Sequence, residues 1–234
     1  MIALEQEFRD RLAADRDLDF EDADPSSIIE WAAEAVGRER LVVATSFGPS
    51  GMVNVHMLAR IAPEVPVVFV DTLYHFDETL ELANVVSQKY GLDVRIYRPA
   101  ESRQEFERMY GERLWERDLD RFHELTKVKP MERALEGVSG WITGRRRDQS
   151  DSRSDMPHVE LGDRVKVNPL ASWTRKDVWE YIVTNSVPYN PLHDRGYTSI
   201  GDEPLTTPTL AGEHERAGRW RGQDRVECGL HTII

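Results

Sequence analysis

The sequence predicts an α/β fold in which a doubly wound, mostly parallel sheet carries helices on both faces. Short, continuous apolar runs such as residues 41–44 and 65–70 are typical of buried parallel strands. Each of these runs is followed by a segment with helical periodicity, and alternating strands and helices form parallel sheets. A run of small residues at 46–51 joins the first strand to its helix. Ligands of such folds bind beyond the carboxyl ends of the strands, so these features also predict where a site should lie.

The expected elements follow one another in strand and helix order. Strands are expected at 41–44, 65–70, 93–97, 140–144 and 165–167. Helical patterns cover 28–35, 52–59, 77–86, 101–118, 129–136 and 174–182. Ser26 or Ser27 can cap the first of these helices, Asp77 the third, and Thr174 begins a pattern like a capping box. Beyond Pro188 the chain is rich in Gly, Pro, His and Thr, which is typical of functional loops and turns.

The composition of the chain argues against several classes of function and location. The net charge of −12 argues against a general nucleic-acid or anionic-membrane partner, although local charge still decides whether a small anion binds. No apolar run approaches the length of a membrane span, and the charged N-terminus lacks a signal-peptide core. A single cysteine with no export signal predicts a reducing, cytoplasmic location. The histidines show no metal-ligand spacing, so no metal is assigned.

Three loops that follow strands are expected to converge on one crevice. The small residues of 46–51 let backbone N–H groups approach an anion, although a plain tight turn explains them equally well. Residues 71–75 begin with Asp71 and Thr72, which suit a ribose or a base edge, or simply cap the loop. Residues 144–153 carry four arginines, whose forked donors suit phosphate or sulfate. The alternative for this loop is a solvated segment paired with its own aspartates.

The only cysteine, Cys228, lies six residues from the C-terminus, so it cannot form a disulfide within the chain. A lone thiol with a function acts as a nucleophile or forms a mixed disulfide with another protein. His231 is close enough in sequence to lower the pKa of the thiol or to move a proton. The alternative is a small, half-buried hydrophobic side chain.

Five motifs in order resemble one enzyme family. They are the Ser46–Gly51 loop, Val70-Asp71-Thr72, Gly144-Arg145-Arg146-Arg147-Asp148-Gln149-Ser150, Arg195 to Asp202, and Glu227-Cys228-Gly229-Leu230-His231. The first is similar to the pyrophosphate loop of the adenine-nucleotide α-hydrolase-like superfamily, a Rossmann-type fold. Together the five resemble the assimilatory adenylyl-sulfate and phosphoadenylyl-sulfate reductases over residues 40 to 231. The C-terminal motif is the most specific of them.

The resemblance implies a two-step reaction. Cys228 attacks the sulfur of the nucleotide-bound sulfate and forms a thiosulfonate, from which thioredoxin or glutaredoxin releases sulfite. Lys127 matches a family lysine that faces the sulfate, and His231 is expected to modulate the thiol. The residues expected to bind the substrate are Ser46, Phe47, Gly48, Ser50, Gly51, Asp71, Thr72, Gly144, Arg145, Arg146, Arg147, Gln149, Ser150, Arg153, Arg216 and Arg219.

This reaction implies a division of the chain into three parts. A helical segment at 1–40 is expected to pack on a nucleotide-binding domain at 41–210. The remaining residues, 211–234, are expected to form a mobile catalytic tail, because Cys228 must visit both the nucleotide and a partner protein. Dimers are common in the family, so a homodimer is a further expectation.

One branch of the family carries a four-iron cluster on four cysteines. Here the matching positions fall near Phe122-His123 and in Asp202-Glu203-Pro204-Leu205, so no iron–sulfur cluster and no other bound cofactor are expected. The cluster-free branch typically uses the 3′-phosphorylated nucleotide, phosphoadenylyl sulfate. Three alternatives stay open: a cluster-free adenylyl-sulfate reductase, an ATP-cleaving adenylyltransferase of the same superfamily, and a non-catalytic nucleotide-binding regulator. The last two leave Cys228 without a role.

Overall fold

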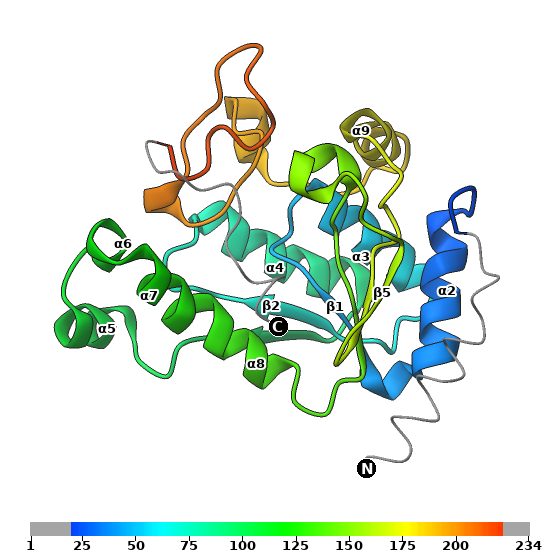
Figure 1. The fold of residues 1–234 in the computed structure, drawn as a ribbon, viewed down its shortest axis with the longest axis horizontal. Helices are drawn as coiled ribbons and strands as arrows, with labels where there is room; N and C mark the ends of the chain where they lie inside the picture. Colours follow the sequence, from blue (N-terminus) through cyan, green and yellow to red (C-terminus); the bar gives the residue numbers. More distant parts are fainter. Residues whose placement is uncertain (1–19, 222–234) are drawn as a thin grey trace.

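The computed structural model describes residues 20–221 of the chain, and within them a six-stranded sheet forms the centre of the molecule (Figure 1). The strand order is β3-β2-β1-β4-β6-β5, and only β5 runs antiparallel to its neighbour. The strands are β1 (Leu41–Ala44), β2 (Val67–Val70), β3 (Val94–Tyr97), β4 (Gly140–Ile142), β5 (Val159–Leu161) and β6 (Val165–Val167). The predicted doubly wound, mostly parallel sheet is confirmed. The antiparallel edge strand β5 is not among the predicted strands.

Helices cover both faces of this sheet. They are α2 (Pro25–Val36), α3 (Pro49–Ile61), α4 (Asp77–Tyr90), α5 (Arg103–Tyr110), α6 (Leu114–Arg117), α7 (Leu119–His123), α8 (Lys129–Ala134) and α9 (Arg175–Thr184). Leu41 and Val43 pack with α2 and α3, whereas Val42 between them packs with α8. Successive side chains of a strand point to opposite faces, so a strand buried on both faces must be apolar throughout. This is the reason that β1 reads as an unbroken apolar run.

The N-terminal ends of three helices can be compared with the capping residues predicted from the sequence. Asp24, not Ser26 or Ser27, caps α2, because its carboxylate accepts a hydrogen bond from the Ser26 N–H at 2.8 Å and Pro25 opens the helix. Asp77 is the first residue of α4 rather than its cap, and it contributes negative charge to the first turn. The Thr174 capping box at α9 is confirmed.

The helix predicted over 101–118 is divided into α5 and α6. Gly111 and Arg113 both have positive φ angles, 84° and 53°, which no continuous helix accommodates. Residues 119–128 form α7 and a π-helical turn that leads directly into α8, and the sequence pattern did not predict this helical segment. The π turn places Lys127 two residues before the start of α8.

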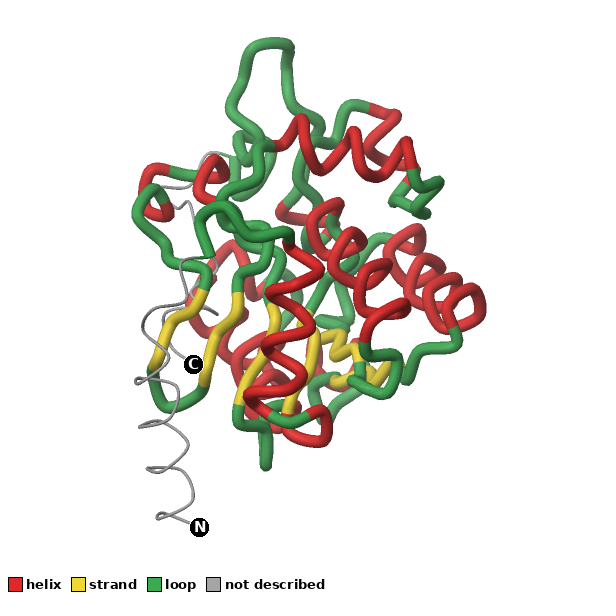
Figure 2. The backbone as a smooth tube through the Cα atoms, turned by 90° about the vertical axis from the view of Figure 1, so that its right-hand side faces the viewer, coloured by secondary structure: helices red, strands yellow, loops and turns green. Residues whose placement is uncertain are grey.

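The loops that follow the parallel strands gather beyond one end of the sheet (Figure 2). The segment after Pro188 joins them there: a bridge pairs His75 with Asp202, and another pairs Thr206 with Arg219. Within residues 20–221, no helix is long and apolar enough to span a membrane. Cys228 and His231 lie outside the described residues.

Candidate active site

A pocket lies where these loops meet, at the carboxyl ends of the parallel strands. Its walls come from four segments: the loop after β1 with the start of α3, the loop after β4, the 198–201 segment, and the 215–219 segment. The loops after β1 and β4 are far apart in the sequence but lie in close contact here. A Cβ on Gly144 would lie 2.9 Å from the Gly51 backbone nitrogen, so glycine is needed for this approach.

The amino terminus of α3 forms one wall of the pocket. Gly48 precedes the helix, Pro49 opens it, and Ser50 and Gly51 follow in its first turn, all of them lining the pocket. The hydroxyl of Thr45 accepts a hydrogen bond from the Phe47 N–H at 2.8 Å, which shapes the turn between strand and helix. The first N–H groups of a helix lack partners within the helix and carry its positive end. This wall therefore suits a phosphate or sulfate group.

The pocket is positively charged although the chain is acidic. Five cationic side chains from the described residues line it, together with one carboxylate, that of Glu215. The cations are Lys127, Arg145, Arg153, Arg216 and Arg219. In a chain with a net charge of −12 this local reversal concentrates anions at one place.

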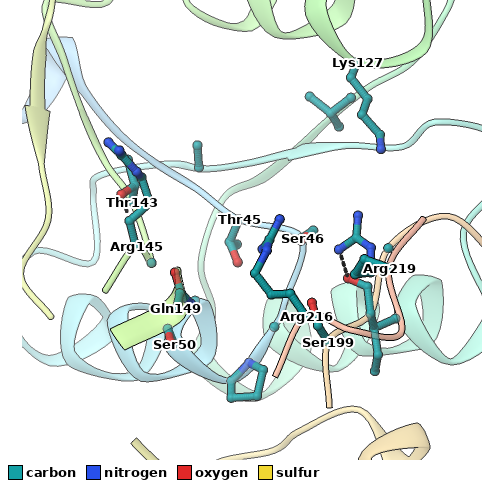
Figure 3. A pocket seen from close by; sticks show the side chains of 18 of the residues that line it. Thr45, Ser46, Ser50, Lys127, Thr143, Arg145, Gln149, Ser199, Arg216 and Arg219 are labelled. Carbon is teal, nitrogen blue, oxygen red and sulfur yellow. Dashed lines mark hydrogen bonds between the residues drawn. The ribbon is translucent and has the colours of Figure 1, made fainter. Parts of the chain in front are cut away.

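The cations form two groups on different sides of the pocket (Figure 3). Lys127, Arg216 and Arg219 point toward the same space near Ser46, whereas Arg145 lies across the pocket beside Thr143. Arg145 forms an ion pair with Glu160 at 2.7 Å. Two separated cationic groups suit a ligand with two anionic groups.

Lys127 is held by a buried carboxylate. Its ammonium lies 2.5 Å from the carboxylate of Asp202, which is fully buried and also accepts a hydrogen bond from the Thr72 hydroxyl at 2.7 Å. Burial alone would raise the pKa of Asp202, but the charge of Lys127 and these hydrogen bonds outweigh it and hold the pKa below its usual value. Asp202 is therefore ionised at neutral pH.

His75 lies beside this pair and also lines the pocket. Its Nε2 lies 3.1 Å from the carbonyl oxygen of Val70, which accepts hydrogen bonds only, so Nε2 carries the proton. Burial lowers the pKa of His75. The side chain is therefore a neutral imidazole at neutral pH, and its Nδ1 is a hydrogen-bond acceptor.

The three adjacent arginines of the loop after β4 have different surroundings. Arg145 faces the pocket, whereas Arg146 is 1% exposed and reaches Asp148, Ser50 and Glu215 at 2.8, 2.5 and 2.7 Å. Arg146 thereby ties the start of α3 to the segment that carries Arg216. Arg147 points elsewhere, into a double hydrogen bond with Glu21. Arg153 returns to the pocket, where it donates to Gln149.

An apolar wall completes the pocket on the α8 side of the sheet. It is formed by strand residues and one helix residue, namely Ala44, Val68, Val70, Trp141 and Met131. An apolar surface beside cationic groups fits a flat aromatic ring that bears charged substituents, as a nucleotide does.

Many of the substrate-binding residues expected from the sequence line this pocket. They are Ser46, Gly48, Ser50, Gly51, Thr72, Gly144, Arg145, Gln149, Arg153, Arg216 and Arg219, joined by Lys127. The other five expected residues, Phe47, Asp71, Arg146, Arg147 and Ser150, are not among the residues that line it. Asp71 is buried and accepts from Arg98 at 2.6 Å and from the Leu73 N–H at 3.0 Å.

Several lining residues were not among the substrate-binding residues expected from the sequence, although His75 belongs to an expected loop and residues 198–201 to one of the five motifs. They are Thr45, His75, Met131, Trp141, Thr143, Thr198, Ser199, Ile200, Gly201 and Glu215. Thr45 and Thr143 each follow a strand directly, so their position beside the two expected loops was a usable signal. Met131 and Trp141 could not be predicted, because in a sequence an apolar residue that lines a pocket looks the same as one in the hydrophobic core.

Comparison with known proteins gives one consistent result. Residues 40–208 match the family described as phosphoadenosine phosphosulfate reductase domain. A Schizosaccharomyces pombe protein named probable phosphoadenosine phosphosulfate reductase is 44% identical over 214 residues, covering 89% of this chain and 80% of the relative. A Halalkalibacterium halodurans protein named adenosine 5′-phosphosulfate reductase is 41% identical over 212 residues, covering 89% and 91%.

A solved structure agrees with these sequence matches. The phosphate complex of phosphoadenylyl-sulfate reductase from Candida auris superposes with a TM-score of 0.73 at 37% identity, covering 80% of this chain and 91% of that one.

Proposed function

Because the chain belongs to the phosphoadenosine phosphosulfate reductase family, we propose that it reduces 3′-phosphoadenylyl sulfate to sulfite and adenosine 3′,5′-bisphosphate. The observation that carries this proposal is the cationic pocket at the start of α3, in an acidic chain whose only thiol, Cys228, comes nine residues after the pocket residue Arg219. Electrons come from thioredoxin or glutaredoxin in the cytoplasm, no resident cofactor takes part, and the enzyme works as a homodimer; these points remain proposals.

In the first step the Cys228 thiolate attacks the sulfur of the sulfate group. A bond forms between the two sulfur atoms, the bond from sulfur to the bridging oxygen breaks, and the nucleotide leaves as a phosphate. The attacking thiolate and the sulfate are both negative, so nearby cations must offset their repulsion. Lys127, Arg216 and Arg219 supply this charge. His231 favours the thiolate by lowering the pKa of Cys228.

In the second step a protein dithiol supplies two electrons. One of its thiolates attacks the sulfur of Cys228, sulfite leaves, and a mixed disulfide forms. The second thiol then releases Cys228 as a thiol and leaves the partner as a disulfide.

The position of Cys228 in the chain fits this chemistry. Trp220, within the described residues, is followed eight residues later by Cys228. Eight residues of extended chain span at most about 28 Å. Arg216 and Arg219 line the pocket just before this stretch, so the thiol can reach the pocket and also a partner outside it.

The choice of the 3′-phosphorylated nucleotide rests on the two separated cationic groups of the pocket. Lys127, Arg216 and Arg219 suit the 5′-phosphosulfate, and Arg145 across the pocket suits a second anion. The relatives are named for both nucleotides, so this second group is the feature that discriminates between them.

The test is sulfite release from both nucleotides with thioredoxin as the reductant. We expect kcat/KM for 3′-phosphoadenylyl sulfate to be at least about tenfold higher, because one charge-assisted phosphate contact is worth roughly 1.5–3 kcal/mol. Arg145→Gln should remove most of this preference, while Arg95→Gln, whose side chain pairs with Asp93, should keep it. Equal efficiencies for the two nucleotides in the wild-type enzyme would refute the substrate assignment and leave the thiol chemistry intact.

Cys228→Ser tests the chemistry itself. We expect this variant to lose turnover while its nucleotide affinity stays within about threefold of wild type, because the pocket and not the thiol supplies the binding energy. Intact-mass spectrometry of wild-type enzyme mixed with substrate, without reductant, should show a sulfonate adduct on Cys228. Substantial sulfite release by the serine variant would exclude the mechanism.

A further inference from the structure

The guanidinium of Arg219 is packed against three residues that take no part in the proposed reaction, namely Trp220, Ile200 and Gly201. Its Cζ lies 4.5 Å from the centre of the Trp220 ring, and its Nη1 donates to the carbonyl of Ile200 at 3.1 Å. It also lies directly on the backbone of Gly201: a Cβ there would come within 2.8 Å of Nε and closer still to Cζ and Nη2. Only a glycine leaves room for the guanidinium in this place.

Trp220 is itself fixed in the fold. Its side chain is 2% exposed and belongs to an apolar cluster with Phe122 and Leu205. Its backbone N–H donates to the carbonyl oxygen of Leu205 at 3.0 Å. The ring also supports a second pocket cation, since the Cζ of Arg216 lies 5.5 Å from its centre.

Such packing restricts an arginine before any ligand arrives. A free arginine side chain samples many rotamers and loses that freedom on binding an anion. A guanidinium stacked on a buried aromatic ring is already held by a cation–π interaction, and its forked donors have a fixed plane. Preorganised donors bind a developing or bound anion better than mobile ones.

We propose that Gly201 and Trp220 form a clamp for Arg219, and that both are positioning residues for the anionic group of the nucleotide. The identity of that ligand rests on the proposed function, whereas the clamp itself rests on the packing around Arg219. The pocket residue Gly201 contributes by the absence of a side chain, and Trp220 by a ring that the core holds in place.

Gly201→Ala is the sharpest test, because its effect on the fold should be small. Gly201 does not have a positive φ angle, and the nearest atoms to a new Cβ belong to the movable end of Arg219. We expect the thermal midpoint to stay within a few degrees of wild type and the Kd for adenosine 3′,5′-bisphosphate to rise about tenfold. In steady state, KM should rise while kcat changes less. Gly162→Ala, where a Cβ meets only an ordinary contact at 3.6 Å, is the matched control.

A double-mutant cycle separates the clamp from a general structural effect. Calorimetric titration with adenosine 3′,5′-bisphosphate, without reductant, is compared among wild type, Gly201→Ala, Arg219→Ala and the double variant. If Gly201 acts through Arg219, the double variant binds no more weakly than Arg219→Ala alone. Multiplied losses in Kd would overturn the proposal.

The aromatic ring is tested in the same way. Trp220→Phe should retain most of the affinity and Trp220→Leu should lose it, and the loss should be smaller in the Arg219→Ala background, where only the contact of the ring with Arg216 remains. Because these measurements are of binding, they stand apart from the sulfite assay. A wild-type enzyme that releases no sulfite but shows the expected cycle would retain the clamp and refute the proposed function. An enzyme that releases sulfite but shows additive losses in the double-mutant cycle would support the proposed function and refute the clamp.

Discussion

The buried carboxylate of Asp202 pairs with one of the pocket cations, Lys127. It shares the Lys127 ammonium with whatever anion enters the pocket, and Thr72 fixes its other oxygen. A fully buried carboxylate is tolerated only because these two partners compensate its lost hydration. Removing the carboxylate would leave Lys127, which is only 11% exposed in its side chain, without its charge partner.

Asp202→Asn should therefore destabilise the protein by about 3 kcal/mol at pH 7, because it breaks a buried ion pair. The native pKa of Asp202 lies below that of the unfolded chain, so its stabilising effect is complete above about pH 4 and fades as the pH falls further. Urea unfolding of wild type and variant at pH 7 and below pH 4 checks this expectation. A difference that does not shrink in acid would contradict it, and adding Lys127→Met should recover part of the loss at pH 7.

Among the elements, the short helices α5, α6 and α7 depend on one aromatic cluster. Phe122 of α7 is fully buried, and its ring centre lies 5.3 Å from that of Tyr74 and 5.6 Å from that of Trp115. Helices of four to eight residues are not stable alone, so tertiary packing must hold them. The cluster also contains Trp220, which links these helices to the arginines of the pocket.

Phe122→Ala should cost about 3–5 kcal/mol of unfolding free energy, since it removes a large side chain from a packed cluster. Chemical denaturation measures this loss. Met109→Ala on α5 is the control: that side chain is 58% exposed, and its removal should change the stability by less than about 0.5 kcal/mol. Similar values for the two variants would show that the cluster does not hold these helices.

At the scale of the whole molecule, the four positions expected to match the cysteines of the cluster-bearing branch are taken up by packing and ion pairing. Of the four positions that match the cluster cysteines, Phe122 and Leu205 belong to the aromatic cluster. Asp202 is engaged with Lys127, and His123 is buried beside Trp220. The His, Cys, Asp and Glu side chains within residues 20–221 form no group of three or more that could hold a metal ion.

We accordingly expect the purified protein to be colourless and to contain less than about 0.1 iron per chain, even when it is prepared without oxygen, because cluster ligation requires cysteine thiolates. Iron analysis and a visible spectrum of the anaerobically purified protein check this expectation. The Cys228→Ser variant should give the same result, since one thiolate cannot hold a four-iron cluster. Stoichiometric iron in either protein would refute it.

The sequence by itself determined the architecture of the sheet and the edge at which the pocket lies. Strand β1 is apolar at every position because both of its faces are covered, and the loops after β1 and β4 meet because parallel strands end at one edge. These features depend on the local pattern of apolar and polar residues, and a short stretch of sequence is enough to show that pattern. The proposed roles of Cys228 and His231 rest on sequence and family, because both residues lie outside the described part of the chain.

Only the tertiary structure decided which side chains meet. Lys127 and Asp202 are 75 positions apart, Thr72 and Asp202 are 130 apart, and no local pattern connects them. The arginines 145–147 look equivalent in the sequence, yet one faces the pocket, one is buried and one pairs with Glu21. Their directions follow from how the loop packs against α3 and the N-terminal segment. Contacts of this kind arise from the packing of distant segments, and packing is a property of the whole fold rather than of any stretch of sequence.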